Sequence, residues 1–541
     1  MLKFNITRKY QEFLLVILSG IILALPWYRH FPGILLFVGF VPLLWAEDYV
    51  SGKYKKHSGR VFLLALIMAL TWNMVATWWI KNASFAGMLA AVVVSSSFMA
   101  IAFWLFHLTK VRLGKKIGYV SFIIFWIAFE FSYLHGQISW PWLTLGYGFL
   151  YNIKLIQWYE FTGALGGTLW VLTMNLFIYS FLKNSPFKLE NKRLRNVQII
   201  GFLALLFAPI ILSVSMYYSY KEKVDPYDIV VVQPNMDPYL KFNDIPPIEH
   251  AMTQIEEAAK LTDENVDFVV TPETSLLGNF WIGKFNDVQD VRLIRNFLSY
   301  YPQCSYVAGI VCRKRYEIGD PYPETAQPLG SRGAHYDYYN SAILVDTTDS
   351  IQLYHKSQLV TGIEKMPYQK QLHFLEKAMV NLGGTFRSNA TQKERAVFQP
   401  LNDSVKIAPI ICWESVFGEY VTDYVKKGAN LLFIITNDGW WGNTPGHKHH
   451  NALGSMRAIE TRRSVARSAN TGISSFINQR GDVLQKLTWW KRGALRQKIN
   501  ANDKITFYVK YGDYIGRTAF WLGIFVILIL VASFLRGKTY A

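Results

Sequence analysis

The residue of greatest chemical interest is Cys412, which stands where two sequence patterns meet. An apolar run containing Ile407, Ile410 and Ile411 predicts a buried strand, and the segment from Trp413 onward is compatible with a helix. A strand-to-helix elbow would place the thiol at the first turn of a helix, where the positive end of the helix dipole favours thiolate. Free cysteine is also among the most buried residue types, so a thiol in the hydrophobic core is the alternative.

Two charged residues follow other predicted strands of the same region. Glu273 comes after an apolar run and a proline turn in FVVTPETSL, and Lys356 follows the strand and turn at Ala342–Thr348. Either residue alone is typical of a solvated loop. Together with Cys412 they form coherent chemistry: a carboxylate takes the thiol proton, the sulfur attacks a carbonyl, and an ammonium holds the developing oxyanion. We therefore predict a reactive Cys412 with Glu273 and Lys356 within reach.

The elements that must position these residues alternate between short β-rich runs and amphipathic helical patterns. This alternation, over about Val224–Tyr511, predicts one α/β domain of ordinary size. The predicted strands are Asp228–Gln233, Val266–Thr271, Tyr306–Val311, Ala342–Asp346, Ile407–Cys412, Leu431–Thr436 and Ser474–Asn478, and the predicted helices are Ile248–Leu261, Val288–Tyr300 and His450–Ala469.

The composition of the whole chain is unusually apolar for a purely soluble enzyme. Of 541 residues, 51% are hydrophobic and only 17% are charged, which indicates a chain that is part membrane protein and part globular. Most of the apolar segments reach or approach the roughly 20 residues that a membrane-spanning helix needs. They are Phe13–Trp27, Phe31–Ala46, Val61–Ile80, Ala83–Phe106, Ile117–Tyr133, Trp158–Leu182, Val197–Tyr217 and Ile515–Leu535, and the second is the weakest because it is short and contains Pro42.

Lys and Arg residues are concentrated in every second connection between these segments. One set of connections holds eighteen Lys and Arg residues, whereas the other holds only Arg29, Lys81 and Lys154. The positive-inside rule therefore predicts that both termini face the cytoplasm and that the domain between the last two segments is exported. Most of the net charge of +18 follows from this topology, so no nucleic-acid partner is expected. No small-x-small cleavage site follows Pro26 and Trp27, so the first segment is predicted to be retained.

All three cysteines fall in the exported domain. Cys304 and Cys312 bracket a strand-like run, and eight residues at about 3.3 Å each would separate them by about 26 Å, too far for a disulfide. We therefore expect Cys412 to be unpaired. The HKHH run at His447–His450 resembles a transition-metal site, but no cysteine or acid stands at a useful spacing, so neither a metal nor a cofactor is expected.

The order Glu273, Lys356, Cys412 resembles the nitrilase superfamily, and the whole chain resembles the apolipoprotein N-acyltransferase family. The local matches cover nearly the full length. They are VVVQPNMDPYLKF at 230–242, PETS at 272–275, ICWES at 411–415, NDGWWGN at 437–443, RAIETRRSVARSANTGIS at 457–474, and Glu130 followed by SWPWLTLGYG at 139–148. The sequence departs from the family pattern at Trp413, Phe242 and Thr271, where tyrosine, tryptophan and tryptophan are common, and in the loop before Glu364, but no catalytic group is lost.

The resemblance implies a fold, a set of site residues and a reaction. The fold is a membrane α-helical bundle of about eight spans joined to an α/β nitrilase-like αββα sandwich, with residues 1–223 as the N-terminal membrane domain, 224–511 as the catalytic domain and 512–541 as the last span and tail. The family pattern assigns catalysis to Glu273, Lys356 and Cys412. It assigns supporting roles to Glu364, Trp413 and Glu414, and substrate contacts to Phe242, Glu130, Trp140, Trp142, Trp440, Trp441 and His450.

The implied reaction is a two-step acyl transfer. Cys412 takes an acyl chain from a membrane phospholipid as a thioester and passes it to the N-terminal amine of a diacylglyceryl-cysteine lipoprotein. The implied setting is the bacterial inner membrane, as a multi-pass monomer in the lipid bilayer with its catalytic domain on the periplasmic side. Aromatic loops at Leu276–Trp281 and Trp440–Trp441 are expected to cover the site or to pack as an interfacial belt. A membrane-tethered nitrilase-type amidohydrolase and a ligand-binding transporter or receptor remain as alternatives.

Overall fold

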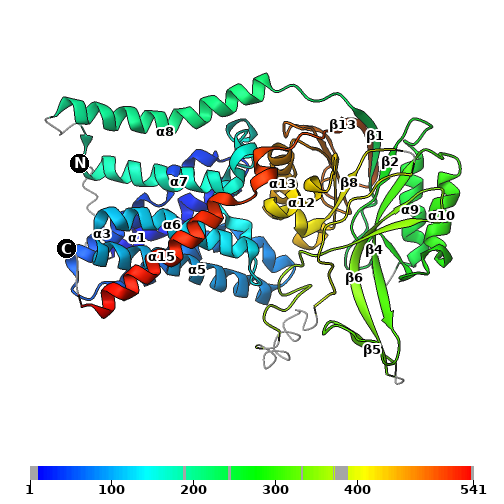
Figure 1. Ribbon diagram of the computed structural model, residues 1–541, viewed down its shortest axis with the longest axis horizontal. Coiled ribbons are helices and arrows are strands. Elements are labelled where there is room, and N and C mark those ends of the chain that lie inside the picture. Colours follow the sequence, from blue (N-terminus) through cyan, green and yellow to red (C-terminus); the bar gives the residue numbers. More distant parts are fainter. Residues whose placement is uncertain are drawn as a thin grey trace. The chain divides into compact units, whose positions relative to one another are not determined.

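The computed structural model describes residues 10–186, 191–241, 245–330, 333–369, 371, 388–401 and 403–537. The chain folds into two compact units (Figure 1). The helical unit comprises Met1–Lys81, Phe85–Ser219 and Asp513–Ala541, and the α/β unit comprises Asn82–Ser84 and Tyr220–Gly512.

The helical unit contains all eight of the predicted apolar segments as helix. Seven stretches of the described residues are long and apolar enough to cross a membrane, and the first, Gln11–Trp27, is shorter. The principal helices are α1 (Gln11–Ala24), α3 (Val41–Lys53), α4 (Ser58–Thr77), α5 (Phe85–Leu113), α6 (Lys115–His135), α7 (Tyr159–Lys183), α8 (Lys192–Ser219) and α15 (Tyr514–Leu535). The predicted membrane bundle is therefore confirmed as a class of fold.

The segment with Pro42 is a broken helix. Its first part, α2 (Leu36–Gly39), stops at Phe40, and α3 starts at Val41 with Pro42 in its first turn. Asn175 of α7 repairs the break: its side chain accepts a hydrogen bond from the Phe40 N–H at 2.8 Å and donates one to the Leu36 carbonyl at 2.7 Å. Such repair is needed because a lipid interior offers no water to these backbone groups.

The α/β unit is built on two sheets that face each other. The first sheet has the order β13–β1–β2–β4–β6–β5, with β3 paired to β4 and β7 to β6, and the second has the order β12–β11–β10–β9–β8. The first contains β1 (Pro226–Gln233), β2 (Phe268–Val270), β3 (Leu276–Trp281), β4 (Ser305–Tyr316), β5 (Gln327–Leu329), β6 (Ala334–Val345), β7 (Ile351–His355) and β13 (Gly493–Asn500). The second contains β8 (Ile407–Ile411), β9 (Leu431–Thr436), β10 (Ser464–Ala469), β11 (Ser475–Ile477) and β12 (Val483–Lys486).

Helices cover the outer faces of both sheets. Contacts join α9 (Pro247–Ala259) and α10 (Gln289–Leu298) to the first sheet, and α12 (Gly418–Lys426) and α13 (Pro445–Thr461) to the second, while β1 contacts β10 between the sheets. The central strands of both sheets run parallel, and β1, β2, β8 and β9 read as nearly continuous apolar sequence because they are buried on both faces. The predicted αββα sandwich is confirmed.

Two local predictions were wrong. The helix predicted at His450–Ala469 ends at Thr461, Arg462 takes a left-handed conformation with φ +52°, and Ser464–Ala469 forms β10 between β9 and β11. Burial in the sheet overrides the mixed polar sequence here. The segment Leu276–Trp281, expected as an aromatic loop, is strand β3, and its Leu276 and Phe280 side chains lie in the core.

Candidate active site

The structure brings the ends of three strands together around one polar cluster. Glu273 follows β2, Lys356 follows β7 and Cys412 follows β8. The Lys356 Nζ atom lies 2.9 Å from Glu273 Oε1, and Glu273 and Cys412 are near enough for each to shift the pKa of the other. Glu273 precedes Lys356 by 83 positions and Cys412 follows it by 56, yet all three share one buried site.

Glu273 is held as an ionised carboxylate. Burial opposes its ionisation, but the Lys356 charge and several hydrogen bonds outweigh burial and hold the pKa of Glu273 below its usual value. Oε1 also accepts a hydrogen bond from the Asn340 amide at 2.8 Å, and Oε2 accepts one from the Asn437 backbone N–H at 3.1 Å.

Lys356 is held between two carboxylates. Its Nζ lies 2.9 Å from Oε1 of Glu273 and 2.9 Å from Oε1 of Glu364. Although burial favours the neutral amine, the two carboxylates raise the pKa of Lys356 well above its usual value. Among the described residues, two of its three N–H donors bind carboxylates, which leaves the third for another oxygen.

Cys412 has a strained backbone and a protonated thiol. Its φ is +50°, which L-residues with a side chain rarely adopt, and such strain concentrates at functional sites. The residue keeps 8% of its surface exposed. Burial and the Glu273 charge raise the pKa of the Cys412 thiol above its usual value, even though Lys356 opposes the shift.

This result corrects the prediction of a helix-stabilised thiolate. The segment after the strand, Cys412–Val416, is a short 3-10 turn, and α12 begins only at Gly418. One turn of this kind does not supply enough dipole to offset burial beside an anion.

Glu414 ties the Cys412 turn to the Lys356 turn. Its Oε2 accepts the Ile411 N–H at 2.9 Å and its Oε1 accepts the Ser357 N–H at 2.8 Å, so one carboxylate fixes both backbone segments. Three tyrosine hydroxyls complete its shell, from Tyr354 and Tyr420 at 2.6 Å and from Tyr424 at 3.1 Å. The side chain of Trp413 is buried and packs edge-on against Phe417.

A buried triad of His450, Asp438 and Arg467 also contacts the Cys412 backbone. The Nε2 atom of His450 lies 3.2 Å from the Cys412 carbonyl oxygen, and its Nδ1 lies 2.8 Å from Asp438 Oδ1. Arg467 donates to Asp438 Oδ2 at 2.7 Å, and this charge helps to hold the pKa of Asp438 far below its usual value against the effect of burial. His450, expected as a substrate contact, lies buried inside α13 and contacts the Cys412 carbonyl and the Ser415 hydroxyl of the nucleophile turn.

Gly309 and Lys241 shape the turn that carries Glu273, and the sequence analysis missed both. The Gly309 N–H donates to the Pro272 carbonyl at 3.2 Å, and Thr274 has a φ of +48°. The Lys241 ammonium donates to Thr274 Oγ1 at 2.9 Å and to the Glu273 carbonyl at 3.3 Å, and burial lowers the pKa of Lys241 to about 7. A glycine inside a strand was the available signal, because it often marks a close backbone approach.

Replacing Gly309 with alanine should disable the site without unfolding the unit. The added methyl would lie 2.5 Å from the Pro272 oxygen and 2.6 Å from both the Glu273 Cα and the Thr274 N, so the Glu273 backbone must move. Misplacing a catalytic group by about 1 Å can cost about 100-fold in rate. We expect a loss of that size in the rate of Cys412 acylation, measured by intact-protein mass spectrometry.

The matched control is Gly454→Ala on α13. There the nearest atom to an added methyl is the flexible end of the Ile477 side chain at 3.0 Å, so the rate should fall little. If Gly309→Ala acylates at the wild-type rate, Gly309 does not position Glu273.

The remaining predicted contacts are distributed over both units. Trp440 and Trp441 are half-buried in the α/β unit, where Trp440 packs against Tyr239 and Trp441 against His450. Phe242 lies outside the described residues.

Three predicted contacts lie in the helical unit. Trp142 is buried against Trp79, and Trp140 stacks on Trp142. Glu130 is buried and accepts hydrogen bonds from the Trp126 indole, the Leu145 N–H and the Thr168 hydroxyl at 2.6–3.0 Å. These three donors satisfy the buried Glu130 carboxylate. Through them Glu130 anchors the 3-10 turn Leu145–Phe149 to α6 and α7.

Comparison with known proteins agrees with this arrangement. Residues 229–504 match the model of the carbon-nitrogen hydrolase family, and residues 19–177 match that of the apolipoprotein N-acyltransferase N-terminal domain. The chain therefore belongs to the carbon-nitrogen hydrolase family and combines that domain with the membrane domain of the N-acyltransferases.

Whole-length relatives carry the same combination. The chain is 27% identical to the apolipoprotein N-acyltransferase of Chlorobaculum tepidum over 97% of this chain and 97% of the relative. It is 26% identical to that of Geobacter metallireducens over 93% of this chain and 92% of the relative, and 25% identical to that of Thermotoga maritima over 98% and 95%.

Proposed function

We propose that this N-acyltransferase moves an acyl chain from a membrane phospholipid, through a thioester on Cys412, to the N-terminal amine of a diacylglyceryl-cysteine lipoprotein. Glu273 is the base, Lys356 holds the oxyanion and Cys412 is the nucleophile. The observation that carries the proposal is the buried cluster in which Glu273 pairs with Lys356 and lies near enough to Cys412 for the two groups to shift each other's pKa. The whole-length similarity to apolipoprotein N-acyltransferases supports a lipoprotein as the acyl acceptor.

The first half-reaction forms the thioester. The Cys412 sulfur bonds to the ester carbonyl carbon of the phospholipid while its proton passes to Glu273. The pKa of Glu273 is lowered and that of the Cys412 thiol is raised, so Glu273 does not deprotonate the free thiol. The proton therefore moves to Glu273 only as the new C–S bond forms. The third N–H of Lys356 stabilises the oxyanion. The C–O bond then breaks, and Glu273 returns the proton to the oxygen of the departing lysophospholipid.

The second half-reaction uses the same groups in the reverse order. The lipoprotein amine attacks the thioester carbonyl, and Glu273 takes the proton that the nitrogen loses. The C–S bond breaks, an amide remains on the lipoprotein, and the proton on Glu273 passes to the Cys412 sulfur. Water must be kept from the thioester, because water would hydrolyse it before the amine attacks. The small exposed fraction of Cys412 is consistent with this requirement.

The charge pattern supports a placement in the bacterial inner membrane. Residues 1–223 and 512–541 form the membrane domains with cytoplasmic termini, and residues 224–511 form the periplasmic catalytic domain. Substrate contacts are assigned to Phe242, Trp140, Trp142, Trp440 and Trp441, and the chain acts as a monomer. Confinement of both lipid substrates to one bilayer reduces the entropy cost of bringing them together.

A single-turnover experiment tests the proposal. Full-length protein in detergent with phosphatidylethanolamine should gain the mass of one acyl chain, and hydroxylamine should remove it. A diacylated lipopeptide with a free N-terminal amine should then discharge the enzyme and gain the chain, whereas the same lipopeptide with an acetylated amine should not. Discharge at equal rates with both peptides, together with hydrolysis of small amides, would favour the amidohydrolase alternative instead.

A further inference from the structure

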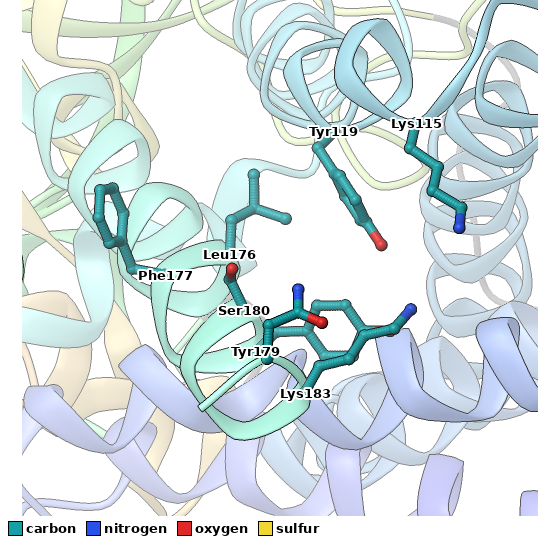
Figure 2. Close-up of a pocket in the computed structure, with 8 residues that line it drawn as sticks. Lys115, Tyr119, Leu176, Phe177, Tyr179, Ser180 and Lys183 are labelled. Atoms are coloured by element: carbon teal, nitrogen blue, oxygen red, sulfur yellow. The ribbon is translucent and has the colours of Figure 1, made fainter. Parts of the chain in front are cut away.

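A second charged site lies in the helical unit, where the ends of α3, α5 and α7 meet the start of α6. Two adjoining cavities of about 560 and 350 Å³ share Lys115, Tyr179 and Lys183 in their linings. Lys110 and Asp48 line the larger cavity, and Tyr119 lines the smaller one. Figure 2 shows Lys115 and Tyr119 of α6 extending toward Tyr179 and Lys183 of α7.

Two acidic residues, Glu47 and Asp48, fix Lys110 and Lys183 in place. Asp48 pairs with Lys110 at 2.5 Å, and it also binds Lys183 and the Tyr179 hydroxyl. Lys110 forms a second ion pair with Glu47, which in turn contacts His107 at 2.6 Å. Within the part of the chain that the structure describes, the cavity linings and the residues paired to them thus hold three ammonium groups, Lys110, Lys115 and Lys183, and two carboxylates, Glu47 and Asp48, which leaves one excess positive charge.

That extra charge is best assigned to Lys115. Among the residues that the structure describes, Lys115 has no ion-pair or hydrogen-bond partner, and its side chain is exposed at the cavity. It is also the first residue of α6, which no side chain caps. An uncapped helix start beside a lysine attracts an anion, because free N–H groups and the helix dipole add to the charge.

The walls of the two cavities are partly apolar. Trp45 and Val111 line the larger cavity, with 43% and 40% of their surfaces exposed, and Leu176 and Phe177 line the smaller one. A free inorganic anion would gain nothing from these side chains, whereas a lipid would place its acyl chains against them. Basic pockets between membrane helices on the cytoplasmic side are suited to acidic phospholipid head groups.

We propose that this cavity binds the phosphate head group of an anionic phospholipid through Lys115, Lys110 and Lys183. The lipid comes from the leaflet that faces the basic connections, and it is bound without being consumed. This role does not depend on the acyl-transfer proposal, because none of these residues takes part in the chemistry at Cys412.

Lipid binding to the full-length protein provides the test. Protein stripped of lipid in a neutral detergent is mixed with phosphatidylglycerol, phosphatidylcholine or glycerol 1-phosphate, and binding is read by native mass spectrometry and by thermal unfolding. We expect retained phosphatidylglycerol and a raised Tm, little effect of phosphatidylcholine, and little effect of glycerol 1-phosphate at the same concentration.

Two neighbouring variants locate the site. Lys115→Gln should weaken phosphatidylglycerol binding about fivefold, whereas Lys116→Gln, one residue further along α6 and absent from both linings, should not. Both variants should still form the thioester at Cys412, which separates this site from the catalytic one. Equal binding by the two variants, or equal effects of phosphatidylcholine and phosphatidylglycerol, would overturn the proposal. Binding of glycerol 1-phosphate as tight as that of the lipid would overturn the lipid as the occupant.

Discussion

Cys412→Ala should retain no acyl chain when it is mixed with phospholipid and should lose transferase activity by at least about 10³-fold. Removing the nucleophile of a covalent mechanism eliminates the intermediate, and comparable losses are known for nucleophile variants of other enzymes. The measurement is the intact mass of the protein after incubation with phospholipid, with and without hydroxylamine.

Cys304→Ala is the matched control. Cys304 is also a buried free thiol whose pKa burial raises, but it packs in the hydrophobic core of the first sheet, and the groups that shift its pKa are Asp267 and Val269. This variant should gain the acyl mass as the wild type does. An acyl mass that persists in Cys412→Ala, or that disappears in Cys304→Ala, would identify a different nucleophile.

The sequence contained enough information to find the cluster but not its electrostatics. Glu273 and Cys412 each follow a strongly apolar run, whereas Lys356 follows β7, a short and mixed strand that was not predicted. Polar site residues collect at the carboxyl ends of sheet strands. Which way the Cys412 pKa moves depends on how deeply the thiol is buried and on the sign of its nearest charge. Both depend on residues distant in the sequence. The strand-to-helix pattern therefore predicted a thiolate, whereas the structure favours a neutral thiol.

Residues that act through others were also beyond sequence reasoning. Asn340 is an interior residue of β6, and it reaches Glu273 only because β6 pairs with β4 in a particular register. Arg467 lies on the strand that was predicted as helix, and its bond to Asp438 becomes visible only when β10 is placed beside β9. Pairing between distant segments sets these contacts, whereas hydrophobic periodicity reports only local structure.

Replacing Glu273 with glutamine should slow thioester formation by about 10²- to 10⁴-fold, the usual contribution of a positioned general base. The loss should be near the upper end because the Cys412 thiol stays protonated near neutral pH and cannot react without a base. The wild-type rate should fall as acid protonates Glu273, at a pH below the usual carboxyl range, and should not rise through the range where a free thiol ionises. Single-turnover acylation rates as a function of pH measure both features.

Glu460→Gln provides the control for loss of a buried carboxylate. Glu460 is buried and lies 3.1 Å from Arg457, so its removal tests the cost of breaking a buried ion pair away from Cys412. Its effect should appear in the Tm and leave the shape of the pH profile unchanged, whereas Glu273→Gln should remove the acid limb of the profile. If Glu273→Gln keeps that acid limb, another group accepts the thiol proton, because glutamine cannot titrate in this range.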